Sequence, residues 1–138
     1  MISIRNLNQK YGGTQILWNV DLEISAGSRT CIMGRNGVGK TTLLKVLMGL
    51  LPAHSGEILF QDKPIHKEIP EARPYMGIAY VPQGRDIFPL LTVEENLLVG
   101  LPCRSDGAKT VPEKIYDLFP VLKEMKSRRG GDLSGGQQ

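Results

Sequence analysis

The sequence predicts an α/β fold, in which a β-rich first part (residues 1–83) precedes a helical second part (residues 84–138). Three observations predict it. Apolar and polar residues alternate in the first third of the chain, as in half-buried strands. A glycine-rich loop then stands between an apolar run and an apolar helix. From about residue 84, helix-capping residues and prolines replace the alternating pattern.

Five strand-like stretches are predicted in the first part. "ISIRNL" and "ILWNVDLEIS" alternate on either side of the turn "YGGT", and "GEILFQDKPI" has the pattern of a hairpin with Asp62 and Lys63 near its tip. "SRTCIMG" is a short apolar run that we expect to form a strand at about 29–33. "GIAYV", at 77–81, is continuously apolar, which is typical of a buried strand in a parallel sheet.

Helices are predicted from their start and stop signals. "KTTLLKVLMGL" is expected to be helical and to end at Gly49 and Pro52. Thr92 and Glu95 form a capping box that opens a helix closed by Gly100. Pro112 is placed in the first turn of the helix "PEKIYDLFP". "VLKEMKSRR" is expected to continue helical before Gly130 and Gly131.

Composition places the chain among ordinary soluble domains. It has 138 residues, 41% hydrophobic and 22% charged, which suits one domain or part of a larger one. The net charge of +3 argues only weakly for anionic partners, and no nucleic-acid partner is expected. The basic residues between Lys123 and Arg129 are interpreted as a solvated helix face, with a binding patch as the alternative.

Two cysteines make neither a disulfide framework nor a metal cluster. Cys31 lies in the apolar run "CIM", where we expect a buried structural thiol in a reducing cytosol. The N-terminal "MISIRNLNQK" lacks the apolar region of a signal peptide. No stretch reaches the roughly 20 apolar residues of a membrane-spanning helix. A role at a membrane would therefore depend on a partner.

The glycine-rich loop "GRNGVGKTT", residues 34–42, matches the phosphate-binding pattern G-x-x-x-x-G-K-[ST]. In this pattern glycines let the backbone approach a phosphate, amides point inward, and the positive end of the next helix faces the anion. Lys40 would reach the β- and γ-phosphates, and the Thr41 hydroxyl would bind Mg²⁺. The whole loop, Gly34, Arg35, Asn36, Gly37, Val38, Gly39, Lys40, Thr41 and Thr42, is predicted to bind ATP.

Three further features narrow the family. "YVPQ" places Gln83 directly after an apolar strand, "LSGGQ" at 133–137 is a second glycine-rich helix start, and Tyr11 lies in a turn before the loop. In this order they resemble the ATP-binding subunit of an ABC transporter over the whole chain. "GRNGVGKTTLLKVLMGLLP" and "VPQGRDIFPLLTVEENL" are most similar to the ATPases of branched-chain amino-acid and urea importers, with the urea type preferred. The resemblance implies a β-rich N-terminal subdomain, a RecA-like core and a helical subdomain.

The resemblance implies a role for each site residue. Tyr11 would stack on adenine, with an ordinary turn tyrosine as the alternative. Gln83 would contact Mg²⁺ and the attacking water, unless it is only a polar residue at a strand end. A second subunit's ATP would be bound by the signature residues Ser134, Gly135, Gly136 and Gln137, for which the alternative is a helix cap without a ligand.

The same resemblance implies partners and a location. Each ATP would lie between the loop of one ATPase subunit and the signature of another, in a homo- or heterodimer. The segment "GRDIFPLL" would face the transmembrane permease subunits, although Ile87, Phe88 and Leu90 are equally compatible with the core of the helical part. The protein would be cytoplasmic and peripheral on the cytoplasmic face of the cell membrane.

The family's chemistry also needs an Asp for Mg²⁺, a Glu that activates water and a sensing His, all after the signature. Asp62 ends the apolar run "ILFQD" but is followed by Lys63 and is interpreted as part of the hairpin, and His54 and His66 lie in loops before the signature. We therefore expect a domain truncated in the C-terminal part of its core and marginally stable alone. We expect such a chain to bind nucleotide without hydrolysing it. Besides an importer subunit and a non-hydrolysing fragment, a further alternative is a soluble ABC ATPase that takes no part in transport.

Overall fold

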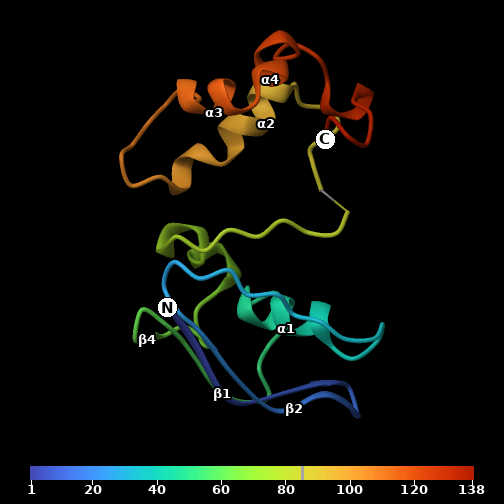
Figure 1. Cartoon of the computed structure of the whole chain (residues 1–138), viewed down its shortest axis with the longest axis vertical. Coiled ribbons are helices and arrows are strands. Elements are labelled where there is room, and N and C mark those ends of the chain that lie inside the picture. Colours follow the sequence, from blue (N-terminus) through green and yellow to red (C-terminus); the bar gives the residue numbers. More distant parts are fainter. Residues whose placement is uncertain (85) are drawn as a thin grey trace. The chain divides into compact units, whose positions relative to one another are not determined.

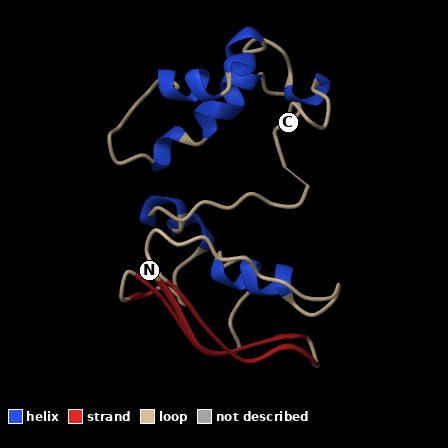
Figure 2. Ribbon diagram, viewed as in Figure 1, coloured by secondary structure: helices blue, strands red, loops and turns tan. Residues whose placement is uncertain are grey.

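The computed structural model describes residues 1–84 and 86–138 as two compact units, Met1–Ile78 and Ala79–Gln138. The first unit contains all four strands of the described chain and the helix α1 (Lys40–Leu47), and the second unit contains three further α-helices (Figures 1 and 2). Arg85, which belongs to the segment "GRDIFPLL", lies outside the described residues.

The first unit is built on an antiparallel sheet of order β2-β1-β3-β4. Its strands are β1 (Ile2–Tyr11), β2 (Thr14–Ile24), β3 (Ser55–Phe60) and β4 (Lys63–Pro64). The two hairpins predicted from the alternating pattern are confirmed. The second one turns at Gln61 and Asp62, both of which adopt a positive φ of the kind that a tight two-residue hairpin turn requires.

Three register shifts interrupt the pairing of β1 with β2: between Ile4 and Leu7, between Leu7 and Gln9, and between Gln9 and Lys10. Asn6 (φ 48°) and Asn19 (φ 44°) supply the left-handed backbone at the first two shifts, a conformation that asparagine tolerates better than most residues. Because each shift adds one residue to a strand, the bulges keep Ile4 and Leu7 on the buried face although they are three residues apart.

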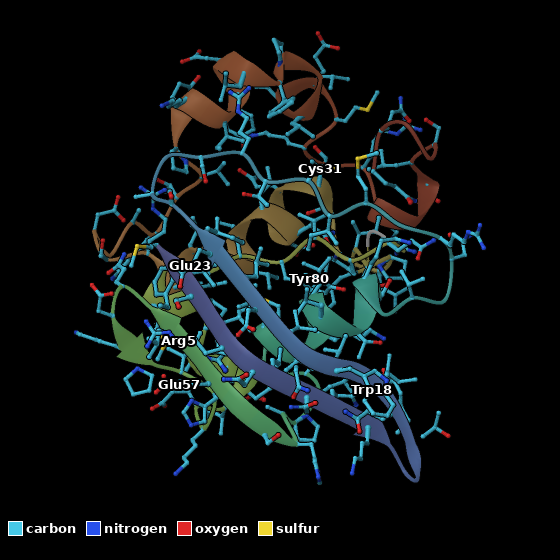
Figure 3. All side chains as sticks on the ribbon, turned by 60° about the horizontal axis from the view of Figure 1, so that its bottom comes forward. Arg5, Trp18, Glu23, Cys31, Glu57 and Tyr80 are labelled. Carbon is cyan, nitrogen blue, oxygen red and sulfur yellow. The ribbon has the colours of Figure 1, made fainter. Side chains whose placement is uncertain are left out.

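Helix α1 packs on one face of the sheet and contributes Leu43 and Val46 to the apolar core of the first unit. Figure 3 shows the helix behind the sheet, while Arg5, Trp18 and Glu57 label the strands in front. Thr42, Leu43 and Val46 are the buried residues of α1, and Gly49 stops the helix with a φ of 74°. The buried apolar side chains of this unit are Ile4, Leu7, Leu17, Leu43, Val46, Met48, Ile58, Ile65 and Ile78.

The strands predicted at 29–33 and 77–81 are not formed, and this prediction was wrong. Residues 29–33 have no ladder partner within the described chain, and neither do residues 77–81. Met33 is 86% exposed, and Val81 is 84% exposed. A single extended segment gains no backbone hydrogen bonds without a neighbouring strand, so apolar composition alone does not hold it in a sheet. For the same reason Cys31 is exposed, not buried as predicted.

The second unit contains α2 (Val93–Val99), α3 (Glu113–Leu118) and α4 (Pro120–Glu124). The capping box at Thr92 is confirmed: the Glu95 amide donates to the Thr92 hydroxyl at 3.2 Å, and the Thr92 amide donates to the Glu95 carboxylate at 2.7 Å. As predicted, Gly100 caps the helix at its C-terminal end. Val93 and Tyr116 are the buried apolar residues here.

Two helical predictions in this unit need correction. Pro112 is the residue before α3 and not part of its first turn, because its backbone is extended (ψ 135°). The stretch predicted helical at 121–129 is helical only to Glu124, and its remainder turns and forms a bridge between Arg129 and Thr92. The helix ends early because the carbonyls of Lys126 and Arg128 accept hydrogen bonds from the amides of Glu94 and Val93 at the start of α2.

Candidate functional site

The glycine-rich loop is exposed and leaves its amides free. Residues 34–38 are all solvent-exposed, and Gly39 is half-buried. Within residues 1–84 and 86–138, no protein acceptor is bonded to the backbone amides of residues 34–39. Unpaired amides at a glycine-rich turn are the groups that bind phosphate oxygens in anion-binding loops. The loop therefore has the donors that its sequence predicts.

The side chain of Lys40 closes this loop. Its ammonium donates to the carbonyl oxygen of Gly34 at 2.7 Å and to that of Arg35 at 2.6 Å. Lys40 is the first residue of α1, so its side chain reaches back from the helix to the beginning of the loop. A cation thus lies beside the free amides, which is the charge that a phosphate group requires.

The first residues of α1 are positioned by Gly39. This glycine adopts a φ of 98°, and a Cβ on it would lie 2.9 Å from Leu17 Cδ2. Leu43 donates its amide to the Gly39 carbonyl at 2.8 Å, which begins the helical hydrogen bonding. Thr41 is exposed, and Thr42 is buried. Of the two threonines, therefore, only Thr41 offers its side chain to solvent at the N-terminal end of the helix.

Tyr11 belongs to the same unit as the loop. It is the last residue of β1, pairs with Thr14 across the turn, and is 46% exposed. The hairpin approaches the loop because the side chains of Ile16 and Leu17 lie within 3.2 Å of a Cβ built on Gly39. An exposed aromatic ring thus lies on the hairpin whose second strand contacts the loop.

A magnesium ion fits this site only when phosphate oxygens supply further ligands. The described residues contain no group of three or more His, Cys, Asp or Glu side chains that could hold a metal. Thr41 supplies one exposed hydroxyl. Since Mg²⁺ commonly takes one or two protein ligands together with substrate phosphates and water, this donor set fits a nucleotide-bound ion better than an independent metal site.

The remaining predicted site residues belong to the second unit. Gln83 is exposed in a turn directly after residues 79–82, which form no helix or strand. Ser134, Gly135 and Gly136 are exposed and form a single turn, in which the amides of Gln137 and Gln138 donate to the Ser134 carbonyl at 2.9 and 3.1 Å. The Ser134 amide donates to the Gln137 side-chain oxygen at 3.0 Å. Gln137 thus stabilises the turn by capping its first amide.

Sequence reasoning identified the capping box but overlooked Asn96, one residue further along α2. The Asn96 side chain makes four hydrogen bonds to backbone groups of Phe88, Leu91 and Thr92. The signal available in the sequence was an asparagine inside a helix, where its propensity is low and a specific contact is required.

Comparison with known proteins assigns the family. Residues 17–138 match the ABC transporter family, and the chain therefore belongs to it. Among curated proteins, it is 38% identical to a probable branched-chain amino acid transport ATP-binding protein LivF of Archaeoglobus fulgidus and 37% identical to the high-affinity branched-chain amino acid transport ATP-binding protein BraG of Pseudomonas aeruginosa. Both matches cover 100% of the chain.

Solved structures agree with this assignment. The dimeric bacterial ABC transporter cassette MJ0796 has a TM-score of 0.81 at 28% identity over 99% of the chain, and the ATP-binding cassette MJ1267 has a TM-score of 0.76 at 32% identity. The chain spans 59% and 60% of the two curated relatives and 65% and 60% of these cassettes. Its fold is thus that of part of a P-loop ABC ATPase.

Within residues 1–84 and 86–138, no helix combines the length and apolar character needed to cross a bilayer.

Proposed function

We propose that the chain is part of the energy-coupling ATPase subunit of an ABC importer and that its own contribution is to bind ATP. The observation that supports this most strongly is the loop at residues 34–39, whose amides have no partner in the described part of the chain and whose Gly34 and Arg35 carbonyls hold the Lys40 ammonium. The two relatives at 37% and 38% identity are both transport ATP-binding proteins.

In the proposed complex, the loop amides bind the phosphates and Lys40 exchanges its two carbonyl partners for β- and γ-phosphate oxygens. Tyr11 stacks on the adenine ring. Thr41 and Gln83 are the residues that would hold Mg²⁺, which neutralises charge on the phosphates when bound. Gln83 also orients the attacking water. These roles follow from the family to which the chain belongs.

The proposed assembly is a dimer of ATPase subunits on a permease. Ser134, Gly135, Gly136 and Gln137 bind the γ-phosphate of ATP held by the other subunit, through the hydroxyl and the free amides of the turn. Support comes from the exposure of Ser134, Gly135 and Gly136 and from the dimeric cassette to which the chain is similar. ATP binding closes the dimer, and closure moves the permease.

The permease is proposed to meet the segment after Gln83. Phe88 is 52% exposed, and Leu90 is 81% exposed, so both present apolar surface to a partner. Apolar side chains exposed beside a polar rim are typical of protein interfaces. The subunit is accordingly placed on the cytoplasmic face of the cell membrane.

The transported solute is proposed to be a branched-chain amino acid or urea. The pattern "VPQGRDIFPLLTVEENL" resembles the group that contains both kinds of importer, of which the urea type is preferred here. The names of the two relatives favour branched-chain amino acids. Because permease and binding subunits recognise the solute, a transport assay with both solutes distinguishes these possibilities.

The test is to assemble the complete subunit with its permease in vesicles and to measure ATP hydrolysis and solute uptake. We expect uptake that requires ATP and is lost in Lys40→Ala, whereas Lys45→Ala, on the same helix, retains it. Uptake that persists in Lys40→Ala contradicts the proposal.

A second candidate is nucleotide binding without turnover by residues 1–138 themselves. It is supported by the loop amides and the Lys40 ammonium, which are groups that bind a phosphate. Hydrolysis by the 138-residue chain that disappears in Lys40→Ala would overturn this second candidate.

A further inference from the structure

Asn96 connects α2 to the loop segment that precedes it in the second unit. Its Oδ1 accepts the Phe88 amide at 2.8 Å, and its Nδ2 donates to the Phe88 carbonyl at 3.0 Å. One side-chain amide therefore pairs with both backbone groups of Phe88, as a neighbouring strand would. Nδ2 is also 3.2 Å from the Leu91 carbonyl and 2.8 Å from the Thr92 carbonyl, so Asn96 holds residues 88–92 against α2.

The held segment is bonded directly to the chain that precedes the signature. The Gly130 amide donates to the Leu91 carbonyl at 2.8 Å, and the Gly131 amide donates to the Pro89 carbonyl at 3.0 Å. On the other side, the Val93 amide donates to the Arg128 carbonyl at 2.9 Å. Residues 88–93 and 128–131 thus lie side by side like two strands.

A side chain at Gly130 would have little room in this junction. A Cβ built on it would lie 3.0 Å from the Phe88 carbonyl oxygen, 3.1 Å from Ile87 Cδ1 and 3.2 Å from Asn96 Nδ2. Contacts this short mean that a displacement of Phe88 has to be followed by Gly130 or by Asn96, because packed atoms do not compress.

Leu133 and Gln138, on either side of the signature turn, are hydrogen-bonded to Gly130. Leu133 donates its amide to the Gly130 carbonyl at 3.2 Å, and the Gln138 side chain donates to the carbonyls of Gly130 and Leu133 at 3.3 and 3.2 Å. Residues of both segments also line a cavity of about 330 Å³, among them Phe88, Asn96, Gly130, Leu133 and Gln137. The hydrogen bonds at Gly130 and Gly131 are the direct connection between them.

We propose that Asn96 is a positioning residue that transmits movement of residues 86–91 to the signature turn at 134–137. The inference rests on the proposed function in one respect, namely that residues 86–91 meet the permease and the turn meets ATP. Asn96 itself touches neither ligand. By holding Phe88 against Gly130, where a side chain would have little room, it makes the two segments move as one.

The connection can be tested in the 138-residue chain without any transport. Asn96→Asp keeps the volume and the acceptor for the Phe88 amide but removes the donors to three carbonyls. We expect hydrogen exchange at the amides of Gly130, Gly131 and Gln137 to accelerate by about 10-fold or more, a typical coupling magnitude. The control is Tyr116→Ala, which removes a buried side chain of α3.

The inference is overturned if Tyr116→Ala accelerates these amides as much as Asn96→Asp does at equal loss of stability. Should Asn96→Asp not fold, Gly130→Ala tests the junction from the other side. Its added Cβ presses on the Phe88 carbonyl, and we expect faster exchange at the Phe88 amide. An unchanged Phe88 amide in Gly130→Ala contradicts the connection.

A second experiment tests the role of Asn96 in the complete subunit assembled with its permease. We expect Asn96→Asp to lower the stimulation of ATP hydrolysis by transported solute by about 10-fold, with the KM for ATP unchanged, because transmission and not nucleotide binding is affected. If the wild-type assembly shows no ATP hydrolysis, the proposed function fails. If wild type is stimulated and Asn96→Asp is stimulated equally, the inference about Asn96 fails.

Discussion

The Lys40 ammonium lies 2.7 Å from the carbonyl oxygen of Gly34, six residues earlier in the chain. This hydrogen bond closes the glycine-rich loop from the first turn of α1 and leaves a cation beside amides that have no acceptor among the described residues. A phosphate can replace the carbonyl as the partner of Lys40, because a charged acceptor bonds an ammonium more strongly than a neutral one does.

Replacing Gly56 should destabilise the sheet of the first unit strongly. Gly56 adopts a φ of 96°, and a Cβ on it would lie 2.5 Å from the Asn6 carbonyl oxygen. Left-handed backbone alone costs about 1–2 kcal/mol for a residue with a Cβ, and the clash with backbone adds to this cost. We expect Gly56→Ala to lower the free energy of unfolding by about 3 kcal/mol or more in urea titration.

Gly27→Ala is the matched control for Gly56→Ala. Gly27 has a φ of 72°, but no atom lies within 4 Å of its Cβ position. It should show the backbone cost of about 1–2 kcal/mol without the clash. Equal losses in the two variants would contradict the close approach of β1 to Gly56.

Asn8 should stabilise the bulged hairpin through its side chain. Its Nδ2 donates to the Asn6 carbonyl at 2.8 Å and to Asn19 Oδ1 at 3.0 Å, while its Oδ1 accepts from Gln15 and from the Asn19 amide. We expect Asn8→Ala to cost about 1–3 kcal/mol of stability. Asn8→Asp retains the acceptor and should cost less; a cost equal to that of Asn8→Ala would refute the role of the acceptor.

The capping box predicts a pH dependence of α2. The amide and hydroxyl of Thr92 donate to the Glu95 carboxylate and hold its pKa below the ordinary value. A lowered pKa in the folded state means that the stabilisation is present above the unfolded pKa and is lost as the pH falls through the folded one. We expect α2 to fray on acidification below about pH 4.

The fraying is measured by the Cα chemical shifts of α2 in a pH titration. Glu95→Gln keeps an acceptor but does not titrate, so its shifts should stay constant over the same range. Asp106, whose pKa is lowered to about 2 by Arg104, responds at still lower pH and lies outside this helix. An identical titration of α2 in Glu95→Gln would exclude the capping box as the cause.

The aromatic ring of Tyr11 should contribute to nucleotide affinity without distinguishing bases. Stacking of a base on an aromatic side chain is worth about 1–3 kcal/mol. We therefore expect Tyr11→Ala to weaken binding of ATP and of GTP by about 10-fold each, and Tyr11→Phe to retain both affinities. A tenfold loss in Tyr11→Phe would show that the hydroxyl and not the ring makes the contact.

Local signals in the sequence were sufficient where a structure depends on neighbouring residues. The two hairpins, the glycine-rich loop before α1 and the capping box at Thr92 each require only residues within one turn or one strand pair, and each is confirmed. The positions of Asn6 and Asn19 in left-handed backbone were not predicted, because a bulge shows itself only in the pairing register.

Features that depend on residues distant in the sequence were predicted wrongly or were not predicted. The apolar runs at 29–33 and 77–81 were predicted as strands from composition, but a strand requires a paired neighbour, and within the described residues neither run has one. The bridge from Thr92 to Arg129 ended the predicted helix at 121–129 early. Asn96 was overlooked because its partners at residue 88 lie eight positions away in a loop.

The central claim, that residues 34–42 bind the phosphates of ATP, is tested most directly by calorimetric titration of the 138-residue chain with ATP. We predict saturable binding that Lys40→Ala weakens by at least about 10-fold, since a charged hydrogen bond is worth about 1.5–3 kcal/mol. Lys45→Ala, which removes a cation from the last turn of α1, should bind as wild type does. Equal ATP affinity in wild type and Lys40→Ala, with both folded, would contradict the claim.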